Sequence, residues 1–344
     1  MQKYDFFVGI DIAKATFDVV ATDGAAQHHR VFDNTGAGVT GLLRYLRGEL
    51  GWDARRTGIC MEHTGRYNYH LRRELYRAGA AFHEVSGAVM RAKYRDQRGK
   101  TDKVDAARIA DYLRRYADEL RAYAPMPGAL EDISILIARR DRLVDTRTRF
   151  NNAHTELKTH ASEAQRAEDE GANAELFAVL KRQIKAVDKR LAELLRGEEK
   201  LRGMAERMRS VPGVGPQTVY LLLLATHGFQ RFDTARQLAC HCGVVPFAYS
   251  SGSSVYKRAR VSQRADKRAK QVLTMAAWSA IRMGGRFGAY YERLLERGKA
   301  PLSALNAVRN KLLHTIYAVV KNEVMYEENH QPSYDRPKID LANT

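Results

Sequence analysis

Two aspartates, Asp102 and Asp105, lie three residues apart shortly after Gly99. Thr101 or Asp102 can begin a helix there by accepting bonds from the free amides of its first turn. On such a helix both carboxylates point the same way, with Cβ atoms about 5–6 Å apart. Acids this close repel each other unless a cation lies between them, although they can also simply compensate the helix dipole. The pair therefore indicates either a metal site or an ordinary charged helix start.

The elements before this pair are predicted to form a mixed sheet flanked by helices. Apolar runs and a turn signal at Asp23-Gly24 predict strands over residues 6–12, 16–22, 29–32, 57–62 and 80–85. Apolar residues at helical spacing predict helices over residues 40–50, 66–78 and 101–117. Three strands followed by alternating helices and strands are typical of an α/β domain.

Two further acids stand on these strands, Asp11 in the first and Glu62 at the end of the fourth. With the pair Asp102 and Asp105, they resemble the acid order of the ribonuclease-H-like nuclease fold, in which such acids converge. Carboxylate oxygens suit hard cations such as Mg²⁺, and two metals about 3.5–4 Å apart stabilise the attacking and leaving oxygens of phosphoryl transfer. Taken singly, Asp11 can also be explained as an acid at a strand end, and Glu62 as part of a polar turn. Together, the four predict a metal-dependent site.

The composition points to nucleic acid as the partner. The 344 residues carry a net charge of +17, with a sequence pI near 9.8, and such an excess attracts polyanions. The longest apolar run, residues 219–225, is far shorter than the roughly 20 residues that cross a bilayer. Three cysteines, Cys60, Cys240 and Cys242, are too few for a disulfide framework. We therefore expect a cytoplasmic, nucleoid-associated protein without a membrane partner.

Cations gather just before the acidic pair. Arg95, Arg98 and Lys100 lie in a stretch that also contains Tyr94 and Gln97. A solvated loop would explain this composition. Because the stretch leads directly into the acids, we favour a clamp for the phosphate backbone beside the metals.

The pattern changes after about residue 130. Apolar residues repeat at the three-four spacing of a coiled-coil seam, at Phe177, Leu180, Ile184, Val187, Leu191 and Leu194. A weaker stripe runs through residues 133–150, and a polar stretch separates the two. We predict two long antiparallel helices, which form either a dimerising interaction arm or a hairpin within one chain.

Two segments after residue 210 have the residue types that contact DNA. Gly213 and Gly215 predict a helix-hairpin-helix turn whose free amides bind a phosphate, or a tight turn between helices. A serine-rich stretch then precedes a basic segment that includes Lys257, Arg258 and Arg260. Such a stretch is most often a linker, yet neighbouring cations can stabilise a serine alkoxide and hold a phosphodiester beside it. Amphipathic helices are expected after it, over residues 273–283 and 302–324.

Together these motifs resemble the DEDD transposases of insertion sequences, relatives of the Piv-type DNA invertases. The resemblance rests on Gly9-Ile10-Asp11-Ile12-Ala13-Lys14, Met61-Glu62-His63-Thr64-Gly65, Lys100-Thr101-Asp102-Lys103-Val104-Asp105-Ala106, Val211-Pro212-Gly213-Val214-Gly215-Pro216, and Gly243-Val244-Val245-Pro246 leading to Ser251-Gly252-Ser253-Ser254. It implies an RNase H-like, RuvC-like catalytic domain over residues 1–128, a helical coiled-coil arm over 129–205 and a mostly helical transposase domain with a helix-hairpin-helix over 206–326. Residues 327–344 are predicted to be a flexible tail.

The resemblance also implies a mechanism of recombination. The four acids would bind Mg²⁺, two ions for which Mn²⁺ is a possible substitute. Ser251 of a partner subunit would attack the scissile phosphate, with Ser250, Ser253 and Ser254 as competing assignments. A structured noncoding RNA of the element, a bridge RNA, would select donor and target DNA by base pairing. The protein would act as a homodimer or homotetramer.

Three other interpretations stay open. A RuvC-like junction-resolving or RNase H-like hydrolase would use water and need no serine. An actin-like or sugar-kinase-like ATPase also opens with Val8-Gly9-Ile10-Asp11, but it would need a second glycine-rich phosphate loop that the sequence does not offer. A nucleic-acid-binding scaffold with a decayed site would need none of the acids.

Overall fold

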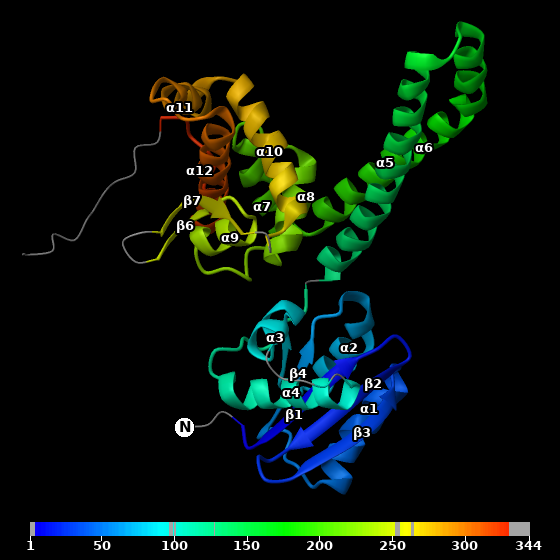
Figure 1. Cartoon of the computed structure of the whole chain (residues 1–344), viewed down its shortest axis with the longest axis vertical. Helices are drawn as coiled ribbons and strands as arrows, with labels where there is room; N and C mark the ends of the chain where they lie inside the picture. Colours follow the sequence, from blue (N-terminus) through cyan, green and yellow to red (C-terminus); the bar gives the residue numbers. More distant parts are fainter. Residues whose placement is uncertain are drawn as a thin grey trace, which may run out of the picture. The chain divides into compact units, whose positions relative to one another are not determined.

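The chain folds into two compact units, Met1–Pro125 and Met126–Thr344. A computed structural model describes residues 4–95, 99, 101–126, 128–251, 255–262 and 265–329. Figure 1 shows the elements of both units. In these ranges, no helix combines the length and apolarity needed to cross a membrane.

The first unit is built on a mixed sheet of five strands in the order β3-β2-β1-β4-β5. The strands are β1 (Phe6–Ile12), β2 (Thr16–Thr22), β3 (Gln27–Asp33), β4 (Thr57–Glu62) and β5 (Phe82–Val85). The first three are antiparallel neighbours, whereas β4 runs parallel to both β1 and β5. The predicted strands are confirmed, and the mixed sheet is consistent with an RNase H-like domain.

Helices cover both faces of this sheet (Figure 1). They are α1 (Gly36–Arg44) with a π turn η1 (Tyr45–Glu49), a 3₁₀ turn η2 (Gly65–Asn68) leading into α2 (Tyr69–Arg77), α3 (Gly87–Lys93) and α4 (Asp102–Tyr116). Because side chains of a strand alternate between faces, Val8 and Ile10 of β1 pack with α1 and α2. Phe7, on the opposite face, packs with α3 and α4.

The second unit is mostly helical. Its elements are α5 (Gly128–His160), α6 (Glu163–Gly197), α7 (Glu199–Ser210), α8 (Pro216–Thr226), α9 (Ala235–His241), β6 (Pro246–Ser251), β7 (Val255–Val261), α10 (Lys267–Arg282), α11 (Gly285–Glu296) and α12 (Pro301–Lys321). One apolar core joins the base of α5 and α6 to the helices from α7 to α12.

The two long helices α5 and α6 lie side by side as an antiparallel hairpin (Figure 1). The Arg140 guanidinium contacts the Asp188 carboxylate at 2.6 Å, and His154 contacts Asp169 at 2.9 Å, so residues far apart in sequence face each other. Four members of the predicted seam are buried, Leu180, Ile184, Val187 and Leu191. The predicted antiparallel helices are present, while coiled-coil geometry and a dimerising role stay predictions.

The structure also contains elements that sequence patterning did not predict. Helix α3 directly follows the expected strand over residues 80–85 and precedes the basic stretch, and α11 lies between two expected helices. The polar stretch after Ser162 is helical from Glu163, because Ser162 and Gln165 cap α6 reciprocally. Strand β6 leads into the serine-rich stretch and pairs with β7 in an antiparallel hairpin.

Candidate active site

The sheet and α4 meet at a contact that only glycine permits. Gly9 lies in the middle of β1, and a Cβ atom built there would lie 2.1 Å from the carbonyl oxygen of Ala106. Helix α4 therefore packs directly on the backbone of β1, with Ile109 and Leu113 buried beside it. Asp11 is two residues further along β1, on the same face as Gly9. The close packing brings Asp11 next to the first turns of α4.

Helix α4 begins as the sequence predicts. The Thr101 hydroxyl accepts a hydrogen bond from the Val104 amide, so Thr101 is the N-cap. Asp102 and Asp105 occupy the first turn, where carboxylates stabilise the positive end of the helix dipole. Asp105 also accepts a hydrogen bond of 2.9 Å from the Arg108 guanidinium.

Glu62 reaches the same region from the end of β4. This strand is the parallel neighbour of β1, with Met61 opposite Ile10. The Glu62 carboxylate lies against Gly87, the first residue of α3, where an added Cβ would lie 2.0 Å from Oε1. The same Cβ would lie 3.3 Å from an Nη atom of Arg91, so the Glu62 carboxylate and the Arg91 guanidinium flank one point.

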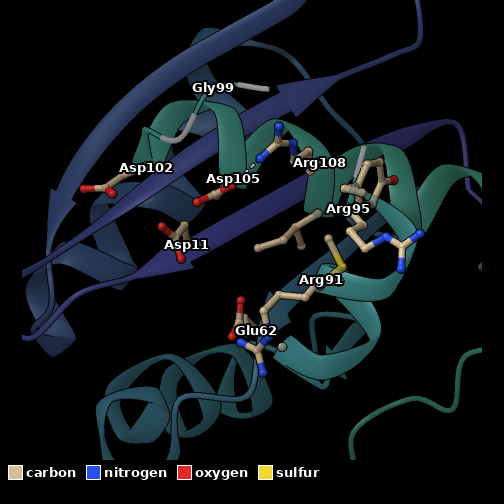
Figure 2. A pocket seen from close by; sticks show the side chains of 12 residues that line it. Asp11, Glu62, Arg91, Arg95, Gly99, Asp102, Asp105 and Arg108 are labelled. Carbon is tan, nitrogen blue, oxygen red and sulfur yellow. Dashed lines mark hydrogen bonds and ion pairs between the residues drawn. The ribbon is translucent and has the colours of Figure 1, made fainter. Parts of the chain in front are cut away.

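All four predicted acids line one cavity of about 690 Å³. Figure 2 shows Asp11, Glu62, Asp102 and Asp105 around it, contributed by β1, β4 and α4. Three arginines also line the cavity, Arg91, Arg95 and Arg108. The cavity thus combines acids that can hold cations with guanidinium groups that can hold phosphates.

The electrostatics of the cavity are those of crowded carboxylates. Burial raises the pKa of Asp11 from 3.8 to about 6, and the neighbouring Asp105, Asp102 and Glu62 contribute to the rise in that order. A cation placed among the acids would remove this penalty. As the side chains stand, no three acid, histidine or cysteine groups of the described ranges are close enough to hold one ion. The oxygen donors and their mutual repulsion nevertheless fit a divalent ion.

The second unit contains the predicted serine and the basic residues that follow it. Ser251 ends β6, and its backbone pairs with Val255, while Lys257, Arg258 and Arg260 are on β7. Several predicted positions lie outside the described ranges, namely residues 252–254, which include two of the competing serines, Arg98, Lys100, and residues 330–344 of the predicted tail.

The two glycines of the predicted phosphate turn differ in their surroundings. Gly213 has φ of 82°, and an added Cβ would lie 2.3 Å from the carbonyl oxygen of Ala276 in α10. Its lack of a side chain therefore serves helix packing. Gly215 precedes α8, and nothing lies within 4 Å of a Cβ added there. Of the two, Gly215 has the open surroundings that a bound phosphate needs.

Comparison with known proteins places this chain in a family. Residues 205–292 match the model of the IS116/IS110/IS902 transposase family, and residues 8–160 match a second transposase model, that of DEDD transposases of the IS110 type. The chain belongs to this transposase family. Its members are DNA recombinases, and the second model spans all four acids of the cavity.

Several relatives align with about two thirds or more of this chain. The pilin gene-inverting protein of Moraxella bovis is 25% identical over 334 residues, which cover 94% of this chain and 98% of that protein. A putative transposase of Sinorhizobium fredii is 26% identical over 261 residues, 67% of this chain and 65% of that protein. The transposase for the element IS1111A of Coxiella burnetii is 26% identical over 252 residues, 66% of this chain and 68% of that protein.

Two buried asparagines that the sequence analysis missed hold the acid-bearing segments together. The Asn68 amide donates hydrogen bonds of 2.9 Å to the Glu62 carbonyl oxygen and 3.1 Å to the Glu84 carboxylate. The Asn34 amide donates to the carbonyl oxygens of Ala13 and Tyr67, both at 3.0 Å. The Asn34 amide thus connects the chain just after β1 with the η2 turn that follows β4, and the Asn68 amide connects this turn with β4 and β5. No local sequence signal marks them, because their partners are distant in sequence or lie in irregular segments.

Proposed function

We propose that this protein is an insertion-sequence transposase that cuts and rejoins DNA with a four-acid metal site and a serine nucleophile. The observation that carries the proposal is the convergence of Asp11, Glu62, Asp102 and Asp105, from three elements, on one cavity. These acids would hold Mg²⁺, most simply two ions, with Mn²⁺ as a substitute because both prefer oxygen ligands. When bound, the ions would stabilise the charge that develops on the attacking and leaving oxygens.

The other residues of the cavity would position the DNA. Arg91 and Arg95 are exposed at its edge and would bind phosphate oxygens on either side of the scissile bond. Arg108 already pairs with Asp105, and would keep that carboxylate oriented. Arg98 and Lys100 would extend the same clamp.

Ser251 would hold the cut DNA strand covalently during recombination. Its Oγ loses a proton to solvent and forms an ester bond to phosphorus, while the bond from phosphorus to the leaving nucleotide oxygen breaks and that oxygen takes up a proton. One phosphate ester replaces another. A hydroxyl of a second strand can therefore attack the serine ester and rejoin the DNA without a nucleotide cofactor. Lys257, Arg258 and Arg260 would hold the flanking phosphates.

We further propose that the serine and the acids come from different subunits of a homodimer or homotetramer. A structured bridge RNA would select donor and target sites by base pairing, and a net charge of +17 favours binding of both nucleic acids. The protein would then act at the nucleoid.

A second candidate function is a RuvC-like or RNase H-like nuclease that uses water. It is favoured by the fact that the acid cavity is formed within the first unit alone. Such an enzyme would need neither Ser251 nor a partner subunit.

One experiment separates the two functions. The full-length protein with its co-purified RNA is incubated with Mg²⁺ and element-end DNA, and protein–DNA adducts are mapped by mass spectrometry. A transposase gives an adduct on a serine of residues 250–254, and Ser251→Ala abolishes both adduct and strand exchange, whereas the matched Ser250→Ala retains them. Continued cutting by Ser251→Ala without any adduct in the wild type would establish the nuclease.

A further inference from the structure

Helix α11 has a basic face that the proposed chemistry does not use. Arg286, Tyr290, Arg293 and Arg297, the last directly after the helix end, follow each other at spacings of four, three and four residues, which places them on one side of a helix. Helix α12 packs against α11 (Figure 1) and adds Lys311 to this side. The Lys311 ammonium lies 4.4 Å from the centre of the Tyr290 ring, and the Arg293 guanidinium carbon lies 5.5 Å from it. We call these five residues the basic face.

Within the described ranges, the cations of the basic face form no ion pair. Arg286, Arg293 and Arg297 are exposed, and none of the ion pairs found in those ranges includes them or Lys311. Burial lowers the pKa of Lys311, and the nearby Arg286 and Arg293 lower it further. Like charges thus gather around one aromatic ring, an arrangement that a polyanion would stabilise.

A carboxylate from elsewhere in the chain occupies the start of the same helix. Gly284 and Gly285 begin α11 with φ of 78° and 58°, values that favour glycine. The Arg286 backbone amide donates a hydrogen bond of 2.6 Å to the Glu328 carboxylate, 42 residues away in sequence. A Cβ on Gly285 would lie 2.2 Å from the same carboxylate oxygen. Free amides at a helix start bind anions, including phosphates.

The segment before Glu328 is fixed to the core. The Tyr326 amide donates a hydrogen bond of 2.8 Å to the Ser210 hydroxyl, and the Tyr326 ring stacks on Phe287 with centroids 6.2 Å apart. Glu328 itself, the second residue after this tyrosine, is exposed. The anchored tyrosine therefore holds an exposed carboxylate at the start of α11, beside Arg286 of the basic face.

We propose that the basic face binds a nucleic-acid backbone and that the Glu328 carboxylate competes with a backbone phosphate for the start of α11. This proposal takes its class of ligand, nucleic acid, from the proposed function. It adds the surface of the second unit that the ligand follows, and a residue that weakens binding. Phosphodiester recognition of this kind serves DNA and RNA alike, so the test has one arm for each.

The test measures binding of the full-length protein, without divalent ions, to a labelled DNA duplex and to an RNA hairpin by fluorescence anisotropy over a range of salt. In at least one arm, the double variant Arg293→Gln/Arg297→Gln is expected to bind about tenfold more weakly. The slope of log K against log salt falls by about 2, because each lost phosphate contact contributes roughly 0.9. Lys311→Gln is expected to weaken binding in the same arm.

The matched control is Arg44→Gln/Arg47→Gln. It removes the same charge from exposed arginines of α1 and η1, on the sheet face opposite the acids, and should change binding by less than about twofold. Glu328→Gln keeps an oxygen to accept the Arg286 bond but removes the charge, and is expected to tighten binding roughly two- to fivefold.

Three results would overturn the inference. Equal losses of affinity in the double variant and its control would show that binding depends on net charge and not on the basic face. Unchanged binding by the double variant in both arms would show that the basic face does not bind nucleic acid. Unchanged or weaker binding by Glu328→Gln, with a lower melting temperature, would leave Glu328 as a structural cap only. If wild-type protein bound neither nucleic acid, the proposed function itself would fail, which is a different outcome.

Discussion

The first unit and the helices from α7 to α12 differ in charge and in architecture. Residues 1–125 contain 21 lysines and arginines and 16 acids, whereas residues 199–326 contain 21 lysines and arginines and only 7 acids. The first region brings four of its acids to one cavity, whereas the second has a large excess of cations over acids. The difference teaches how one chain can meet opposite demands: the proposed metal site needs acids close together, and the proposed binding of a polyanion needs an excess of cations.

The largest effect should come from a single acid of the cavity. Asp102→Asn removes one carboxylate that would hold metal, and we expect strand cutting to fall at least about 10³-fold, since such ions contribute several kcal/mol. Nucleic-acid affinity without divalent ions should stay within about twofold, because the variant leaves every lysine and arginine proposed to contact phosphate unchanged. Gel-based cutting assays and anisotropy measure the two. Loss of affinity parallel to loss of cutting would break the proposed separation.

A smaller loss of activity should follow from a change outside the acids. Gly87→Ala places a methyl group against the Glu62 carboxylate, and a displacement of about 1 Å costs roughly 10²-fold in rate. Gly36→Ala is the matched control: Gly36 is the first residue of α1, and an added Cβ there meets only the Glu74 side chain, at 3.7 Å or more. Cutting rates and the Mg²⁺ concentration for half-maximal rate should change for Gly87→Ala alone. Equal behaviour of both variants would show that Glu62 is not positioned by this contact.

The cost of burying Asp11 among other acids should appear in the free energy of unfolding. Because the pKa of Asp11 is raised to about 6, the folded state takes up its proton more readily than the unfolded state. Charged Asp11 therefore destabilises the metal-free fold above about pH 6, and the effect disappears as the pH falls below about 4. Asp11→Asn should stabilise the metal-free protein by about 1–2 kcal/mol at about pH 7, allowing for solvent screening, and by nothing near pH 3.5. Calorimetry at both pH values tests this, and a destabilised variant at neutral pH would contradict it.

The smallest effects are expected at two helix caps, one from each region. Thr101 caps α4 and Thr234 caps α9 through the same side-chain bond to a backbone amide. Each Thr→Ala variant should lose about 1 kcal/mol of stability. Only Thr101→Ala should also raise the Mg²⁺ concentration needed for cutting, since it loosens the turn that carries Asp102 and Asp105. A metal shift in Thr234→Ala would mean that the regions are energetically coupled.

Local signals predicted the strands and the helix that carry the four acids. The strand around Asp11, the strand that ends at Glu62 and the capped start of α4 all follow from patterns within a few residues. The short helix α3 was missed because its seven residues show no long periodicity. The hairpin of β6 and β7 was missed because a serine-rich stretch resembles a linker, and pairing with β7 decides otherwise.

By itself, the sequence determined which groups are available and where each element begins. Caps, alternation and apolar periodicity depend on neighbours within one or two turns, so they can be read along the chain. The tertiary structure alone decided that α4 packs on Gly9, that Gly87 bounds the Glu62 carboxylate, and that Glu328 reaches the start of α11. These contacts join residues 25 to 97 positions apart, and no local propensity encodes a distance across space.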